Sequence, residues 1–174
     1  MLNENDFIHL ISSRHSVRAF KEAPIQKDKI NAIADASTRG PSAGNLQSYQ
    51  TFVISKKAEK EKLAEAAHGQ GYIAEAPTVM VFCADPKRCG IEYGLRGEEL
   101  FCVQDATIAC TYAQIAAHST GLSSVWIGSF DEDKVSDILK LNNMRPVAIL
   151  PIGFPDETPE NTTRRSLDEV IRWV

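Results

Sequence analysis

The chain has 174 residues, of which 43% are hydrophobic and 24% charged, as is ordinary for a globular protein. This length is typical of a single domain, expected here over residues 1–174. The net charge is −4 and both signs alternate along the chain, which disfavours nucleic acid as a partner. The sequence contains no run of about 18 apolar residues, so it predicts no membrane-spanning helix. The first ten residues lack the pattern of a signal peptide, so we expect a cytoplasmic protein.

Hydrophobic periodicity and turn residues predict alternating helices and strands. In chain order we expect a helix over residues 5–12, a helix over 26–39, a strand over 49–55, a helix over 56–68, a strand over 76–85, a charged connection over 86–97, a helix over 98–119, a strand over 122–130, a helix over 132–141, a strand over 146–154 and a last helix opening at residues 166–169.

Local signals support several of these boundaries. Gly121 follows the longest predicted helix and is typical of a left-handed helix stop. Asp131 precedes the next helix as a candidate N-cap, and Ser166 and Glu169 have the spacing of a capping box. Because helices precede the first strand and no GxGxxG or P-loop pattern occurs, we expect an α+β fold with a mixed central sheet flanked by helices.

The cysteines and histidines predict no metal site. Neither zinc nor CxxC spacing relates the four cysteines, so we expect buried free thiols at Cys83, Cys89, Cys102 and Cys110. His9, His68 and His118 lie far apart in the sequence and show no ligand spacing.

A basic heptapeptide, RHSVRAF at residues 14–20, follows the first predicted helix. Guanidinium groups bind phosphate through forked hydrogen bonds, and a hydroxyl can fill the remaining acceptor positions. This makes Arg14, His15, Ser16 and Arg18 candidate anion ligands. The alternative is a solvated helix end that complements the helix dipole.

Two further stretches carry ligand-binding chemistry. Residues 40–50 hold no charge, and Ser42, Asn45 and Gln47 offer hydrogen bonds suited to a heterocycle. They are also standard turn residues, so a plain loop is the alternative. Arg164 and Arg165 precede a capped helix and predict an anion site, or else they pair on the surface with nearby carboxylates.

In this order the three stretches resemble the FMN-dependent nitroreductase family. The family's RRSxRxF block appears at residues 14–20 and its PSAxNxQPW block at residues 41–49. The AP strand start, the IGxF strand end and the arginine-containing tail also match, so the resemblance covers roughly residues 6–172. Two departures stand out: Ser48-Tyr49 replaces the Pro-Trp pair, which leaves the loop less rigid, and residues 86–101 are polar where relatives often carry aromatic pocket residues.

The resemblance implies a domain-swapped type of homodimer with two FMN sites at the subunit interface. Arg14 and Ser16 would contact the phosphate and the ribityl chain, and Arg18 would lie near the flavin pyrimidine ring. His15, at the variable second position of the block, would be a further cofactor contact. The remaining implied cofactor contacts are Pro41, Ser42, Ala43, Asn45 and Gln47 from the partner subunit, Ile127, Gly128 and Ser129 near the ring edge, and Arg164 with Arg165 at the phosphate.

The implied activity is electron transfer from NADH or NADPH, through FMN, to a small organic acceptor by a ping-pong mechanism. Arg18 would act in catalysis by stabilising the anionic reduced flavin. Three alternatives stay open: a flavin-storage protein, a protein of the same fold that consumes reduced flavin or binds a deazaflavin, and an anion-binding regulator with Cys102 or Cys110 as redox sensor.

Overall fold

The computed structural model describes residues 4–160 and 162–174. Its sheet has four strands, all paired antiparallel in the order β1-β2-β4-β3. The strands are β1 Tyr49–Ile54, β2 Thr78–Ala84, β3 Ser123–Ser124 and β4 Arg145–Gly153. Among the described residues the one parallel pairing is an isolated bridge between Ser16 and Ser124. The predicted α+β class is confirmed, and the mixed character of the sheet is limited to that bridge.

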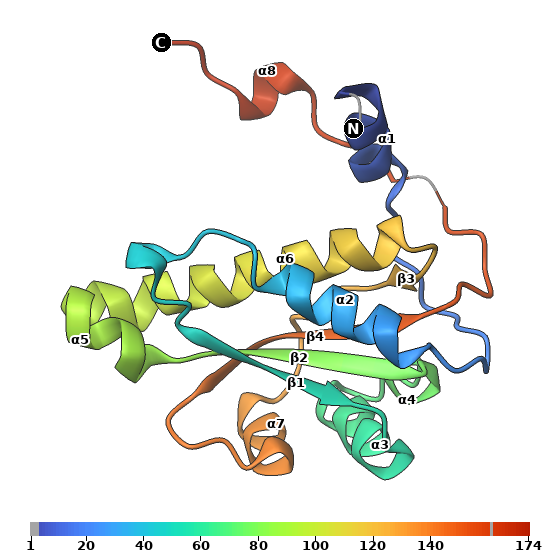
Figure 1. Cartoon of the computed structure of the whole chain (residues 1–174), viewed down its shortest axis with the longest axis horizontal. Coiled ribbons are helices and arrows are strands. Elements are labelled where there is room, and N and C mark those ends of the chain that lie inside the picture. Colours follow the sequence, from blue (N-terminus) through green and yellow to red (C-terminus); the bar gives the residue numbers. More distant parts are fainter. Residues whose placement is uncertain (1–3, 161) are drawn as a thin grey trace.

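Helices cover both faces of the sheet (Figure 1). They are α1 Glu4–Ser13, α2 Lys27–Ser37, η1 Ala43–Asn45, α3 Lys57–Ala66, α4 Tyr72–Glu75, α5 Pro86–Arg96, the π-helical turn η2 Gly97–Phe101, α6 Cys102–Ser119, α7 Glu132–Leu139 and α8 Leu167–Val170. α2 and α6 lie on one face, and α3 and α7 on the other. None of the helices in the described ranges is both long enough and apolar enough to cross a membrane.

Strand β2 explains this two-sided layering. Every residue of β2 is buried, which is why its sequence is an unbroken apolar run. Met80 and Phe82 pack in the cluster that contains α2 and α6, whereas Val79 and Val81 pack in the cluster that contains α3 and α7. Alternation along the strand therefore divides one buried strand between two cores.

The expected connection at residues 86–97 is wrong, because α5 occupies it. Pro86 stands at the start of α5, and the side chain of Asp85 accepts a hydrogen bond from the Arg88 amide at 3.0 Å. Gly94, at φ 56°, breaks the helical geometry inside α5. The predicted helix over residues 98–119 is divided, since η2 precedes α6.

The expected strand over residues 122–130 is also wrong beyond its first residues. Only Ser123 and Ser124 form a ladder with β4, and pairing resumes in the same register at Ile127 with Ile149. That register sets Pro151 opposite Val125. Because proline has no N–H, the ladder is interrupted there.

Gly153, at the end of β4, has no room for a side chain, so its replacement should lower the stability of the fold. A Cβ at this position would lie 2.8 Å from Phe20 Cδ1 and 2.8 Å from Pro77 Cδ. Gly153→Ala is therefore expected to destabilise the fold by about 1–3 kcal/mol through overpacking. Thermal unfolding should show a melting temperature lower by roughly 3–10 °C. Gly71→Ala is the space control, since its φ is −58° and the nearest atom to its added Cβ, Glu75 Oε1, lies 3.9 Å away; equal losses in both variants would contradict the packing argument.

Candidate functional site

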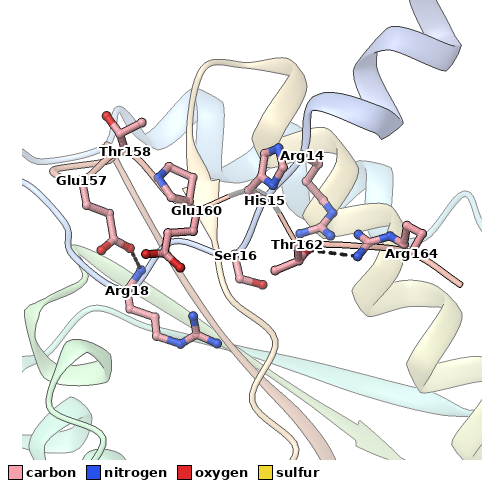
Figure 2. A pocket seen from close by; sticks show the side chains of 10 residues that line it. Arg14, His15, Ser16, Arg18, Glu157, Thr158, Glu160, Thr162 and Arg164 are labelled. Carbon is pink, nitrogen blue, oxygen red and sulfur yellow. Dashed lines mark hydrogen bonds between the residues drawn. The ribbon is translucent and has the colours of Figure 1, made fainter.

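A polar cavity of about 640 Å³ lies where the segment after α1 meets the segment before α8. Its lining residues are Arg14, His15, Ser16, Arg18, Glu157, Thr158, Pro159, Glu160, Thr162 and Arg164. Figure 2 shows these side chains gathered from the two segments. Five of the residues predicted from the sequence thus lie in one cavity, although they come from opposite ends of the chain. We call it the arginine cavity.

Two buried apolar side chains hold the basic heptapeptide in place. Val17 and Phe20 are buried in the core, and the Val17 amide donates to the Ser124 carbonyl at 3.2 Å. Phe20 forms an isolated bridge with Pro155, just after β4. Apolar side chains therefore anchor the segment against the sheet, while Ser16 and Arg18 remain on the cavity side.

Two guanidinium groups in the arginine cavity lack a carboxylate partner. Within the described part of the chain, neither Arg14 nor Arg164 forms a salt bridge. Arg164 donates instead to the Thr162 hydroxyl at 3.1 Å. Burial lowers the pKa of Arg14, and the nearby charge of Arg164 lowers it further. Two like charges held close together, one of them partly buried, form a site that an anion would stabilise.

The positive charge of the arginine cavity acts on a neighbouring histidine. His118, near the end of α6, shares a hydrogen bond of 3.0 Å between its Nε2 and the Ser13 hydroxyl. Burial lowers the pKa of His118, with further lowering from Arg14, His15 and His9. A lowered pKa favours the neutral form of His118, so this histidine responds to the positive charge of the arginine cavity and does not add to it.

Arg18 occupies a separate part of the cavity. Figure 2 shows its guanidinium apart from the Arg14–Arg164 pair. Its backbone N–H donates to Glu157, which fixes the heptapeptide against the segment after β4. Glu157, Glu160 and Thr162 also line the cavity, and no local sequence pattern identified them as site residues.

The side chains of the two adjacent arginines in the tail have different surroundings. Arg164 lines the cavity, whereas the Arg165 guanidinium donates to the carbonyl of Glu169 at 3.1 Å, one helical turn along the tail. The capping box predicted at Ser166 and Glu169 is confirmed. The geometry therefore favours Arg164 over Arg165 as an anion ligand.

The uncharged residues 40–50 do not line the arginine cavity. Pro41, Ser42 and Ala43 line a second cavity of about 700 Å³ together with Tyr93 and Phe101, whose rings meet edge to face at 5.3 Å. The remaining lining residues are Val103, Gln104, Asp105, Thr107 and Ile108. This second cavity is mostly apolar, in contrast to the arginine cavity.

The two cavities lie toward opposite ends of α6. Ala43 bonds to Asp105 near the start of the helix, and Ser13 bonds to His118 near its end. At 1.5 Å per residue these two points on α6 are about 20 Å apart. Asn45 and Gln47 are exposed beside the second cavity, and Gln47 Nε2 lies 3.1 Å from Asn45 Oδ1.

Residues 127–129 line neither of these two cavities. Ile127 is buried, and both its backbone groups pair with Ile149 at 3.0 Å. Gly128 and Ser129 are exposed, and the Ser129 carbonyl accepts a hydrogen bond of 3.3 Å from Gln70. Their role toward a cofactor stays a prediction.

All four cysteines are free and buried, as predicted. Burial raises the pKa of the Cys102 and Cys110 thiols, which disfavours the reactive thiolate. This environment argues against either residue as a redox sensor.

Comparison with known proteins accords with this fold. A NADH dehydrogenase of Thermus thermophilus is 29% identical over 188 residues, covering 92% of this chain and 92% of the relative. An oxygen-insensitive NADPH nitroreductase of Salmonella typhimurium is 30% identical over 172 residues, covering 94% of this chain and 72% of the relative. The solved structure of the NADPH:FMN oxidoreductase from Vibrio harveyi complexed with NAD+ matches with a TM-score of 0.87 at 26% identity, covering 95% of this chain and 76% of that chain.

The model of the Nitroreductase family matches this sequence over residues 11–99 and 70–154, well over half of its length. The chain belongs to the Nitroreductase family.

Proposed function

We propose that this protein is an FMN-dependent oxidoreductase that passes electrons from NADH or NADPH to a small organic acceptor. The observation that carries the proposal is the Arg14–Arg164 pair: two adjacent guanidinium groups, one of them partly buried, with no salt-bridge partner in the described residues. A phosphate would satisfy both through charge-assisted hydrogen bonds. The names of the relatives, which include an NADPH:FMN oxidoreductase, support the same reading.

The residues of the arginine cavity fit FMN by type and arrangement. Arg14 and Arg164 would hold the phosphate, and Ser16 and Thr162 would offer hydroxyl groups beside it. Glu157 and Glu160 are acceptors suited to the hydroxyl groups of a ribityl chain. FMN supplies the hydride acceptance and release; the protein binds it, orients it and sets the charge around its ring.

We further propose that the working unit is a homodimer in which the cofactor site draws on both chains. Within one chain the arginine cavity contains none of the residues of the 41–47 block, which lies toward the other end of α6. A second chain would supply that block. Exposed apolar residues on α1 and the tail support such an interface; they are Phe7, Ile8, Ile11, Leu167, Val170, Ile171 and Trp173.

The second cavity supports an organic acceptor rather than a sugar or a metal complex. Tyr93 and Phe101 present aromatic surface there, and Val103 and Ile108 extend the apolar lining. A flat aromatic or quinone-like molecule would gain most from such a lining. Four buried free thiols fit a reducing compartment, and we propose the cytoplasm.

Steady-state kinetics test the ping-pong proposal. NADH or NADPH would be varied at several fixed concentrations of a quinone or nitroaromatic acceptor, with the protein loaded with FMN. Parallel double-reciprocal lines are expected, because the nicotinamide product leaves before the acceptor binds. Lines that intersect to the left of the vertical axis would require a ternary complex and would reject this mechanism.

Arg18 is expected to tune the cofactor. A cation beside the flavin ring stabilises the negative charge of the reduced form, so Arg18→Ala should lower the reduction potential of bound FMN. We expect a change of about 30 mV or more, equivalent to roughly 1.4 kcal/mol for two electrons. Spectroelectrochemistry measures it, with Arg18→Lys as the charge-preserving control. If the reduction potential is the same in Arg18→Ala and the wild type, Arg18 does not act on the flavin ring.

A further inference from the structure

Asp105 has an unusual position for an acidic residue. It lies on α6 with 2% of its surface exposed, and among the described residues it is the one aspartate or glutamate that is buried. Its two carboxyl oxygens are divided between two backbone amides: Oδ1 accepts from Ala43 at 2.9 Å, and Oδ2 accepts from Ser48 at 3.1 Å. Burial of a carboxylate is unfavourable unless such hydrogen bonds compensate it.

The two amides bracket a strained stretch of backbone. Between them Gly44, Asn45 and Gln47 have positive φ angles of 54°, 57° and 49°. Glycine adopts this conformation freely and asparagine tolerates it, whereas glutamine does so rarely. Such a conformation persists only where the surroundings determine it, and it is concentrated at functional sites.

The other hydrogen bonds of this loop are local or peripheral. The Gln47 amide donates to the Ser42 hydroxyl at 3.0 Å, and the exposed Arg88 side chain donates to the Leu46 carbonyl at 2.6 Å. Asp105 differs from these because it is buried, belongs to the central helix and binds both ends of the strained stretch.

We propose that Asp105 is a positioning residue for the cofactor site: it holds the loop of residues 42–47 in its binding conformation through the amides of Ala43 and Ser48. This inference rests on the proposed function, in which the loop meets the FMN held by the partner chain. The identity of residue 48 matters here. A proline has no N–H to donate, whereas Ser48 supplies the second hydrogen bond, so Asp105 offsets the flexibility expected from the serine.

Asp105→Asn tests the inference with almost no change in side-chain volume. The amide keeps one acceptor oxygen and presents an NH2 group to the other backbone N–H, so one of the two bonds is lost. In the cofactor-free protein, hydrogen exchange of residues 42–48 is expected to accelerate by about tenfold or more, while β2 and β4 keep their protection. The Kd for FMN is expected to rise by about tenfold.

Ala113→Gly is the matched control. Ala113 lies on the same helix and is fully buried away from the loop, so its replacement weakens α6 without touching residues 42–48. This variant should have a lower melting temperature and should keep the wild-type loop exchange and the wild-type Kd for FMN.

The possible outcomes distinguish a failure of the inference about Asp105 from a failure of the proposed function. If Asp105→Asn lowers the melting temperature yet matches Ala113→Gly in loop exchange and FMN affinity, Asp105 is merely structural and the inference is overturned. If loop exchange accelerates while FMN affinity stays at the wild-type value, the loop does not serve the cofactor, and the inference is again overturned. A wild-type protein that binds no FMN would instead reject the proposed function itself.

Discussion

Replacing Arg14 with alanine is expected to raise the Kd for FMN by about tenfold or more. Arg14 is partly buried beside Arg164 and has no salt bridge within the described residues, so its charge is available to a phosphate. A charge-assisted hydrogen bond contributes about 1.5–3 kcal/mol, and each 1.4 kcal/mol is a factor of ten in affinity. Titration of the cofactor-free protein, followed by quenching of FMN fluorescence, measures the change.

Riboflavin and Arg165 provide the controls. Riboflavin lacks the phosphate, so its Kd should be nearly the same for Arg14→Ala and the wild type. Arg165→Ala removes an equal charge from a side chain that is bonded to the Glu169 carbonyl and lies off the cavity, so FMN affinity should be retained. Equal losses for FMN and riboflavin in Arg14→Ala would show that Arg14 acts on something other than the phosphate.

Ending the chain at Arg165 is expected to convert a dimer into a monomer. Residues 166–174 are exposed throughout and α8 buries none of its residues, so the body of the fold does not depend on them. Figure 1 shows this tail extending away from the sheet. Trp173 is 92% exposed and Leu167 75% exposed, which is apolar surface that a second chain would cover.

Sedimentation and FMN titration measure the effect of this truncation. We expect a monomer at micromolar concentration, an unchanged melting transition of the body, and a Kd for FMN raised by about tenfold or more, because half of the proposed site is lost. Val53→Ser is the control: it removes an exposed apolar side chain from the edge strand β1 and should leave the dimer intact. A truncated protein that stays dimeric would contradict the proposed role of the tail.

Patterns that depend on near neighbours could be predicted from the sequence. The apolar run of β2 and the N-cap at Asp131, which accepts from the Lys134 amide at 3.1 Å, are both present in the structure. The start of α5 also had a visible signal in Asp85-Pro86, but the glycines that follow are typical of a loop. Gly94 does interrupt the helical geometry, as its sequence context predicts, but α5 extends on both sides of it from Pro86 to Arg96.

Features that depend on distant partners could not be predicted in this way. The early end of β3 depends on Pro151, which lies opposite Val125 only when β3 and β4 are paired. The proximity of Arg14 to Arg164 joins residues separated by nearly the whole chain, and the family resemblance alone anticipated it. The choice between Arg164 and Arg165 depends on side-chain direction, and the hydrogen bonds of Asp105 depend on how α6 meets a loop.

The central claim is that the chain binds FMN and reduces it with a nicotinamide cofactor. Its most direct test is an anaerobic titration of the FMN-loaded protein with NADH and, separately, with NADPH, followed by visible absorption. We predict that the flavin bands bleach with one equivalent of reduced nicotinamide per bound flavin. A protein that binds no FMN, or a bound flavin that neither NADH nor NADPH bleaches, would contradict the account.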